Sequence, residues 1–270
     1  MSDLSLENYA FLQGLIHKES GIVLGQDKLY LIEARLLPIV KTHSLGSLNN
    51  LCSSLRSLQG SLKSQVVEAM TTNETLFFRD ASPFQALRAH LLPPLIAERA
   101  MTKKLSFWSA AASSGQEAYS LAMLLLEMGL RDWNIQILGT DLNQQILDKA
   151  QAGRYLQIEV NRGLPAAYLV KYFQRTGVEW QIKDEVRRLV TFKQFDLRQS
   201  LRALGPFDFV FCRNVLIYFD ATTKKKILGD VYGTLHRGGY LLLGSAETTI
   251  NIEERFVRKP VGDSTFYQVP

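Results

Sequence analysis

The ten residues from Thr71 to Asp80 alternate hydrogen-bonding side chains with a bulky apolar block. The amide of Asn73, the hydroxyl of Thr75 and the guanidinium of Arg79 can each hold a polar ligand. The run lies where an all-helical pattern gives way to an alternating one, and such a boundary is a favoured place for a ligand pocket. Because the run could also be an ordinary helix-to-helix connection, its interpretation depends on the segments that follow.

Two acidic residues follow the first two apolar runs downstream. Leu105–Ala110 leads through a loop of small residues to Glu117, and Ile135–Thr140 leads directly to Asp141. Small side chains let the main chain approach a ligand closely, and a helix start offers free N–H groups. An acid after the second strand of such a sheet can accept hydrogen bonds from ribose hydroxyls. Each acid could instead cap its own helix.

A third apolar run, Phe207–Cys212, ends in Arg213-Asn214. A buried arginine needs a partner, because burying it unpaired is costly, and ligands of open α/β sheets bind at the carboxyl ends of the strands. The loop after Ala110 has one glycine, so it matches neither a dinucleotide fingerprint nor a phosphate loop. These segments supply acids, amides and hydroxyls but no phosphate-binding loop. The expected ligand is therefore an adenosine joined to an amino acid, as in S-adenosylmethionine, and not NAD or ATP.

The elements that must position these residues divide the chain in two. Apolar residues recur at helical spacing over roughly the first 70 residues, which predicts a small helical bundle. One of its stripes is Leu48, Leu51, Leu55 and Leu58. From Ser82-Pro83, which opens a helix to about Glu98, the pattern changes to strands that alternate with helices. Such alternation predicts crossover units and a mostly parallel sheet.

The segment from Gly153 to Val190 interrupts that alternation. It contains a helical stretch that begins at Pro165 and two short β-like runs, around Glu179–Ile182 and Leu189–Phe192. We therefore predict a small inserted subdomain here.

Composition limits the classes of protein to which the chain can belong. Its 46% hydrophobic and 21% charged residues are typical of a globular protein, and no apolar stretch is long enough to span a membrane. Residues 1–4 lack the layout of a secretory signal, so the expected location is the cytoplasm. Cys52 and Cys212 match no metal-ligand spacing, so no metal is expected. The net charge of +5 is not concentrated in a dense basic cluster, so nucleic acid is not an expected partner.

Four segments closely resemble the signature segments of the CheR family, the chemotaxis receptor glutamate O-methyltransferases. They are Thr71–Asp80, Phe107–Met123, Gly139–Asp141 and Phe207–Phe219. The similarity continues in the same order through Gly239–Glu247 and covers nearly the whole chain. It implies a class I S-adenosylmethionine-dependent methyltransferase fold, which is α/β and Rossmann-like with a seven-stranded sheet. An N-terminal helical domain (1–75) would precede the methyltransferase domain (76–270), which contains the insert at about 153–192.

The resemblance also implies which residues hold S-adenosylmethionine and its product S-adenosylhomocysteine. These are Asn73, Thr75, Arg79, Glu117, Asp141, Asp196, Leu197, Asn214 and Val215. Asp196 and Leu197 match the pair that flanks the adenine, and Tyr218 corresponds to a pocket tyrosine near the reacting centre. Arg79 and Tyr218 are therefore the candidate catalytic residues, as groups that orient a carboxylate. The chain departs from the family pattern around Glu117, where the family commonly has a threonine, paired glutamates and a proline, so the contacts of Glu117 stay open.

The implied reaction methylates glutamate carboxylates in the cytoplasmic helical signalling region of chemoreceptors. No general base is required, because a glutamate with a pKa of about 4.3 is already ionised at neutral pH. The turn around Arg175–Val178 lacks the extra Gly-rich residues of family members that bind a C-terminal receptor tether, so tether binding is not expected. Alternatives are a methyltransferase for receptors of a related non-chemotaxis pathway and a cofactor-loaded, non-catalytic interaction protein.

Overall fold

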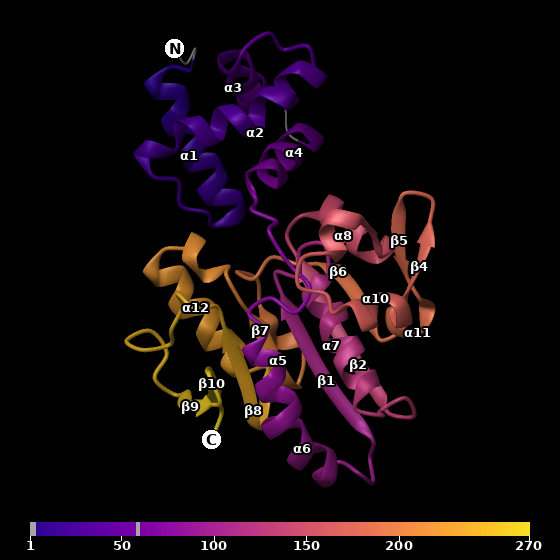
Figure 1. Cartoon of the computed structure of the whole chain (residues 1–270). Coiled ribbons are helices and arrows are strands. Elements are labelled where there is room, and N and C mark those ends of the chain that lie inside the picture. Colours follow the sequence, from indigo (N-terminus) through magenta and orange to yellow (C-terminus); the bar gives the residue numbers. More distant parts are fainter. Residues whose placement is uncertain (1–3, 58–59) are drawn as a thin grey trace. The chain divides into compact units, whose positions relative to one another are not determined.

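The computed structural model describes residues 4–57 and 60–270. The predictions that fall on Leu58 and on the first three residues lie outside the described residues. The chain forms two compact units, each described here by itself (Figure 1). One unit comprises the residues up to Thr72 together with Tyr218–Thr223, and the other comprises Asn73–Ile217 and Lys224–Pro270.

The smaller unit is helical. Its helices are α1 (Leu6–Ser20), the 3₁₀ turn η1 (Gln26–Lys28), α2 (Leu29–Thr42), α3 (Leu48–Ser57) and α4 (Ser61–Met70). Ser5 caps α1, and Gly21 ends it with a left-handed φ of 77° that favours glycine. The predicted apolar stripes meet in one core that includes Leu12, Ile32 and Leu51. The short segment Tyr218–Thr223 joins this unit through hydrogen bonds such as that from the Val23 N–H to the Tyr218 carbonyl oxygen (2.9 Å).

The larger unit is built on seven strands. They are β1 (Lys104–Ala110), β2 (Asn134–Asp141), β6 (Val190–Gln194), β7 (Phe207–Cys212), β8 (Leu235–Leu243), β9 (Val257–Val261) and β10 (Ser264–Gln268). Their order is β6-β2-β1-β7-β8-β10-β9. The first five strands in this order are mutually parallel, whereas β10 is antiparallel to both of its neighbours. The predicted α/β class and the seven-stranded sheet are confirmed.

Helices connect and flank these strands (Figure 1). They are α5 (Ser82–Ala86), the π-helical turn η2 (Leu87–Leu91), α6 (Leu92–Glu98), α7 (Gln116–Glu127), α8 (Gln144–Ala152), the 3₁₀ turns η3 (Leu201–Ala203) and η4 (Leu216–Tyr218), and α12 (Ala221–Tyr232). The helix predicted over 82–98 therefore forms with a widened turn in the middle. Pro93 and Pro94 follow that turn, and neither has an N–H to continue the α-helical bonding. Among the described residues, no helix combines the length and the apolar character needed to cross a bilayer.

The insert has its own three-stranded antiparallel sheet. Its elements are β3 (Arg154–Leu156), α9 (Gln157–Val160), α10 (Ala166–Tyr172), β4 (Phe173–Thr176), β5 (Glu179–Ile182) and α11 (Asp184–Arg187). Gly177 and Val178 alone join β4 to β5, with Gly177 at a φ of 63°. The β-like run predicted at Leu189–Phe192 belongs to β6 of the main sheet instead, because it pairs in parallel with β2.

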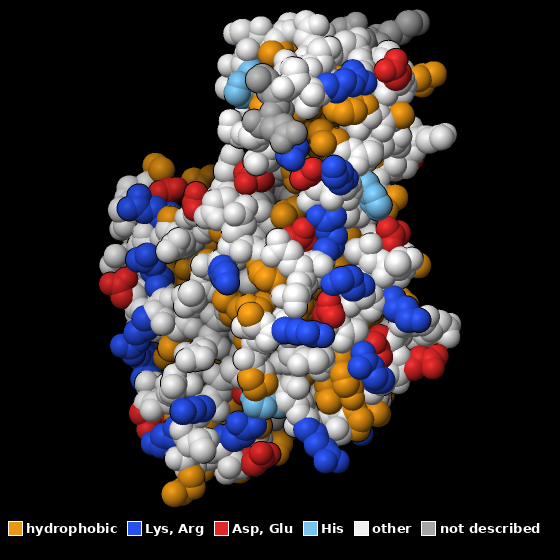
Figure 2. All heavy atoms as spheres, turned by 180° about the vertical axis from the view of Figure 1, so that it is seen from behind, with side chains coloured by type: hydrophobic (Ala, Val, Ile, Leu, Met, Phe, Trp, Pro, Cys, Tyr) orange, Lys and Arg blue, Asp and Glu red, His pale blue; other side chains and the backbone are white. Residues whose placement is uncertain are grey.

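The charges of the larger unit are mixed. On the face shown in Figure 2, Lys and Arg side chains are scattered among acidic and uncharged ones. Three basic residues of the insert pair with acids: Arg162 with Glu74, Lys171 with Glu127 and Arg187 with Asp184. Part of the basic excess of the insert is therefore neutralised by local partners.

Candidate functional site

The carboxyl ends of four neighbouring strands lie in register at one edge of the main sheet. Ala110 of β1 pairs with Thr140 of β2 and with Cys212 of β7, which in turn pairs with Leu243 of β8. The loops that follow these strands therefore leave the same edge side by side, where ligands bind in open α/β sheets.

Backbone strain is concentrated at this edge and in the preceding seam. Five of the eight non-glycine residues with left-handed φ in the described chain lie here, namely Phe78, Asp80, Ala111, Ser113 and Asn214. Each such residue costs on the order of 1 kcal/mol and persists only where its surroundings enforce it. The clustering therefore marks a built site, since strain of this kind collects where loops must take a specific course around a ligand.

Arg213, at the end of β7, links three parts of this site. Its side chain is 3% exposed, and its Nη1 donates to Glu117 Oε2 (3.0 Å). Its Nη2 donates to Asp80 Oδ2 (2.6 Å) and to the Arg79 carbonyl oxygen (3.2 Å). The other oxygen of Glu117 accepts from Ser109 Oγ (2.8 Å). The buried arginine thus has the partners that its burial requires, and Glu117 holds this arginine and does not cap α7.

Asp141 fixes the loop between β1 and α7. Its buried carboxylate accepts hydrogen bonds from the N–H groups of Ser113 (2.9 Å) and Asn143 (3.0 Å). The capping of α8 belongs to Asn143, whose side chain accepts from the Ile146 N–H. On the other side of the loop, Ser113 Oγ donates to the Asn73 carbonyl oxygen (2.8 Å). Asn73 and Asp141 are therefore connected through one serine.

The predicted pair Asp196-Leu197 follows β6. The chain reaches this pair through Phe195, whose N–H donates to the Asp141 carbonyl oxygen (2.8 Å). The Asp196 carboxylate accepts from the guanidinium of Arg198, with Nη2 to Oδ2 at 2.7 Å, and Leu197 is buried. The loops after β2 and β6 are thus tied together at the edge.

Glu247 was not predicted from the sequence as a site residue. Its carboxylate accepts hydrogen bonds from five main-chain N–H groups: those of Asn214, Val215, Leu216, Ile217 and Gly244. It therefore holds the loop that carries the predicted pair Asn214-Val215. A sign of its role in the sequence is an acid three residues after the glycine that directly follows β8.

The remaining predicted residues lie in the segment 71–80 and at the end of η4. Thr75 and Arg79 are half-buried, and Arg79 Nη1 donates to the Glu74 carbonyl oxygen (3.3 Å). Tyr218 groups with the helical unit. The structure therefore joins the predicted residues in two sets of contacts. The first comprises Asn73, Asp141 and Asp196-Leu197. The second centres on Arg213, which binds Glu117 and directly precedes Asn214-Val215.

The edge has the chemistry to hold an adenosine joined to an amino acid. Asn214 Oδ1 is buried and lacks a hydrogen-bond partner among the described residues, so it can accept a bond from a ligand. The carboxylates of Glu117 and Glu247, whose oxygens are engaged by Arg213, Ser109 and main-chain N–H groups, lie near the Cys212 thiol. Burial, together with these two charges, raises the pKa of the Cys212 thiol well above its usual value, so this neighbour remains neutral. The residues present therefore fit S-adenosylmethionine.

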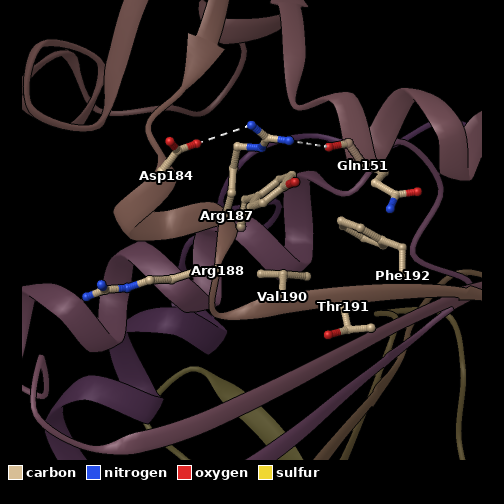
Figure 3. A pocket seen from close by; sticks show the side chains of 8 residues that line it. Gln151, Asp184, Arg187, Arg188, Val190, Thr191 and Phe192 are labelled. Atoms are coloured by element: carbon tan, nitrogen blue, oxygen red, sulfur yellow. Dashed lines mark hydrogen bonds and ion pairs between the residues drawn. The ribbon is translucent and has the colours of Figure 1, made fainter.

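Two hollows of the larger unit differ in their relation to this set of contacts. One, of about 410 Å³, lies beside β6, and none of the predicted site residues lines it. There the Arg187 guanidinium donates to Asp184 and to the Gln151 carbonyl oxygen, both at 3.2 Å (Figure 3). The other, of about 510 Å³, lies beside Arg213 and Glu247 and extends toward β10.

Comparison with known proteins covers both units. The model of the "CheR methyltransferase, all-alpha domain" matches residues 7–71, and that of the "CheR methyltransferase, SAM binding domain" matches residues 73–262. Chemotaxis protein methyltransferase 1 of Pseudomonas aeruginosa is 41% identical over 255 residues, which cover 92% of this chain and 93% of that protein. Chemotaxis protein methyltransferase Cher2 of Pseudomonas putida is 39% identical over 94% of both chains. The Vibrio anguillarum chemotaxis protein methyltransferase is 40% identical over 94% of this chain and 93% of its own length.

Proposed function

Since the chain belongs to the CheR methyltransferase family, we propose that it transfers the methyl group of S-adenosylmethionine to glutamate side chains of chemoreceptors, forming methyl esters. The resemblance of its signature segments to this family is confirmed, as is its use of S-adenosylmethionine. The observation that carries the proposal is the match to chemotaxis methyltransferases over nearly the full length of both partners. It favours an active chemotaxis enzyme over a non-catalytic interaction protein or an enzyme of a parallel pathway.

The chemistry asks little of the protein beyond alignment. Bound S-adenosylmethionine supplies a methyl group on a positively charged sulfur, which takes the electron pair of the broken S–C bond when a carboxylate oxygen attacks. The acceptor glutamate is ionised at neutral pH, with a pKa of about 4.3, so the chain does not have to remove a proton. Its residues must hold the reacting atoms about 3–3.5 Å apart and strip water from the carboxylate.

We assign the cofactor to the residues that the resemblance implies, from Asn73 to Val215. Support comes from the two sets of contacts at the sheet edge, and from the unpaired Asn214 oxygen. Arg79 and Tyr218 are proposed to orient the carboxylates of cofactor and substrate. Glu117 would act partly through Arg213, because both of its oxygens already accept hydrogen bonds.

The proposed partner is the cytoplasmic helical region of a chemoreceptor, and the proposed location is the cytoplasm. The helical domain (1–75) and the insert of the catalytic domain (76–270) are the surfaces that we expect to dock it. The two-residue connection between β4 and β5 supports the prediction that the insert does not bind a receptor tether.

The direct test is transfer of radiolabelled methyl from S-adenosylmethionine to receptor-bearing membranes, followed by mild alkali. Release of the label as methanol would establish a carboxyl ester. Alkali-stable label would overturn glutamate O-methylation in favour of nitrogen or carbon methylation. Receptors with the acceptor glutamates changed to alanine serve as the control and should remain unlabelled.

A further inference from the structure

We propose that Glu247 is a positioning residue for the cofactor: it fixes the backbone of residues 214–217, so that Asn214 and Val215 keep the conformation in which they bind. The inference rests on the proposed assignment of Asn214 and Val215 to S-adenosylmethionine. Glu247 itself acts through this loop and is not assigned to the cofactor.

The contacts of the Glu247 carboxylate divide between its two oxygens. Oε1 accepts from the N–H groups of Val215 (3.0 Å), Leu216 (2.8 Å) and Ile217 (3.3 Å). Oε2 accepts from the N–H groups of Asn214 and Gly244, both at 2.7 Å. Hydrogen bonds to an ionised acceptor are stronger than neutral ones, so this carboxylate holds four successive residues at the start of η4.

The arrangement requires a glycine directly after β8. A Cβ on Gly244 would lie 2.8 Å from both Asn214 Nδ2 and Glu247 Oε2, and 2.9 Å from the Asn214 backbone nitrogen. Real Cβ contacts are essentially never this short, so a larger residue would displace the carboxylate or the loop. Gly244, Glu247 and Asn214 therefore interlock.

The contacts among Gly244, Glu247 and Asn214 leave one buried polar atom, Asn214 Oδ1, without a hydrogen bond among the described residues. Asn214 has a left-handed φ of 57°, and its Oδ1 is buried without a partner among the described residues. Such strain persists only where the surroundings enforce it, and an unpaired buried acceptor is costly. The bonds from Glu247 supply the enforcement, and a ligand donor would supply the missing partner. Holding the loop thus prepares Asn214 for the cofactor in advance of binding.

The decisive variant is Glu247→Gln, which preserves size but replaces one acceptor oxygen with an NH₂ group. Whichever way the amide turns, it loses either the Oε1 set or the Oε2 set of contacts. The matched control is Glu254→Gln, a change at an exposed glutamate seven residues away on the same chain segment. If Glu247→Gln fails to fold, Gly244→Ala tests the same contact from its other side.

The first measurement is hydrogen exchange of the segment 213–218 in the full chain. We expect the amides of 214–217 to exchange at least tenfold faster in Glu247→Gln than in the wild type or in Glu254→Gln. The second is calorimetric binding of S-adenosylhomocysteine, with an expected increase in Kd of at least tenfold for Glu247→Gln. In the methylation assay, the KM for S-adenosylmethionine should rise by a similar factor while kcat falls less than threefold.

The outcomes separate the possibilities. Unchanged exchange would show that Glu247 does not hold the loop, and faster exchange with unchanged Kd would reduce it to a purely structural residue. Either result overturns the inference. Because exchange and calorimetry need no receptor, a wild-type chain that binds S-adenosylhomocysteine but labels no receptor would contradict the proposed function and leave this inference standing.

Discussion

The carboxyl edge of the main sheet and the insert use the same residue types in different ways. At the edge, Arg213 is 3% exposed and pairs with Glu117, which is 12% exposed. In the insert, the side chain of Arg187 is 37% exposed, and its partner Asp184 is 94% exposed. Exposed pairs contribute about 0–1 kcal/mol, whereas breaking a buried pair by removing one partner costs about 3–5 kcal/mol.

The difference shows that the importance of an arginine depends on which segments its side chain connects. Arg213 connects the seam, β7 and α7, which come from distant parts of the chain. Arg187 contacts Asp184, three residues away, a carbonyl oxygen at the end of α8 and the Tyr119 side chain of α7, and its partner Asp184 is almost fully exposed. We therefore expect substitutions at the edge to change both stability and cofactor binding, and those at the insert to change little.

The largest effect is expected from Arg213→Ala. It leaves the carboxylate of Glu117 poorly exposed and without its cation, so the free energy of unfolding should fall by about 3 kcal/mol or more. This loss is measured by urea denaturation monitored by circular dichroism. The affinity for S-adenosylhomocysteine should also decrease. If the free energy of unfolding falls by less than about 1 kcal/mol, the Arg213–Glu117 pair behaves like an exposed ion pair, and the contrast with the insert is wrong.

A smaller effect is expected from Asp141→Asn. The amide retains one acceptor oxygen, so either the Ser113 or the Asn143 N–H loses its partner, at about 1–3 kcal/mol for a buried donor. Because the β1–α7 loop is released, the Kd for S-adenosylhomocysteine should rise about tenfold, measured by calorimetry. Asp148→Asn, on the exposed face of α8, is the control. Unchanged affinity in Asp141→Asn would remove Asp141 from the cofactor site.

The sequence allowed the framework of this edge to be predicted, but not its connections. The runs ending at Ala110, Asp141 and Cys212 are apolar and are followed by polar residues, so both strands and loops were recognisable. The acid at the end of one strand holds the loop that follows a neighbouring strand, as Asp141 holds the loop after β1. These contacts depend on the order of the strands in the sheet, which no local sequence pattern contains. Glu247 was missed because its five donors are main-chain groups, and these leave no residue-type signature.

The strands near the C-terminus and at the sheet edge were harder to predict for a related reason. β9 contains Pro260, and its first four residues are exposed, so it lacks the apolar alternation of a half-buried strand. β6 is short and only partly buried, and it was therefore grouped with the insert. β9 is held by a hairpin with β10, whereas β6 is held by the distant strand β2, which is tertiary information.

The two cysteines extend the comparison to pH. Burial raises the pKa of Cys52 in the helical unit to about 11, and it also raises the pKa of Cys212 in β7 well above its usual value. An unfolded thiol ionises near pH 8.5, so above that pH the unfolded chain binds fewer protons and stability falls. Each cysteine should contribute a loss approaching about 1.4 kcal/mol per pH unit.

The measurement is the free energy of unfolding between pH 7 and 9.5 for the wild type, Cys52→Ala and Cys212→Ala. Each variant should lose a pH-independent amount of unfolding free energy, because the substitution leaves a small cavity. Above pH 8.5 the free energy of unfolding should fall less steeply with pH than in the wild type, because one fewer thiol loses its proton on unfolding. Equal slopes in all three proteins would mean that neither thiol is held neutral by folding.

The smallest effect is expected from Arg187→Ala, which is the counterpart of Arg213→Ala. Its ion pair with Asp184 is exposed, so the free energy of unfolding should change by less than about 1 kcal/mol. The hollow that it lines is separate from the residues assigned to the cofactor, so S-adenosylhomocysteine should bind within about twofold of the wild-type affinity. A strong loss of binding would couple the insert to the sheet edge through β6, which begins at this hollow and ends two residues before Asp196, and the two regions would then be one functional unit.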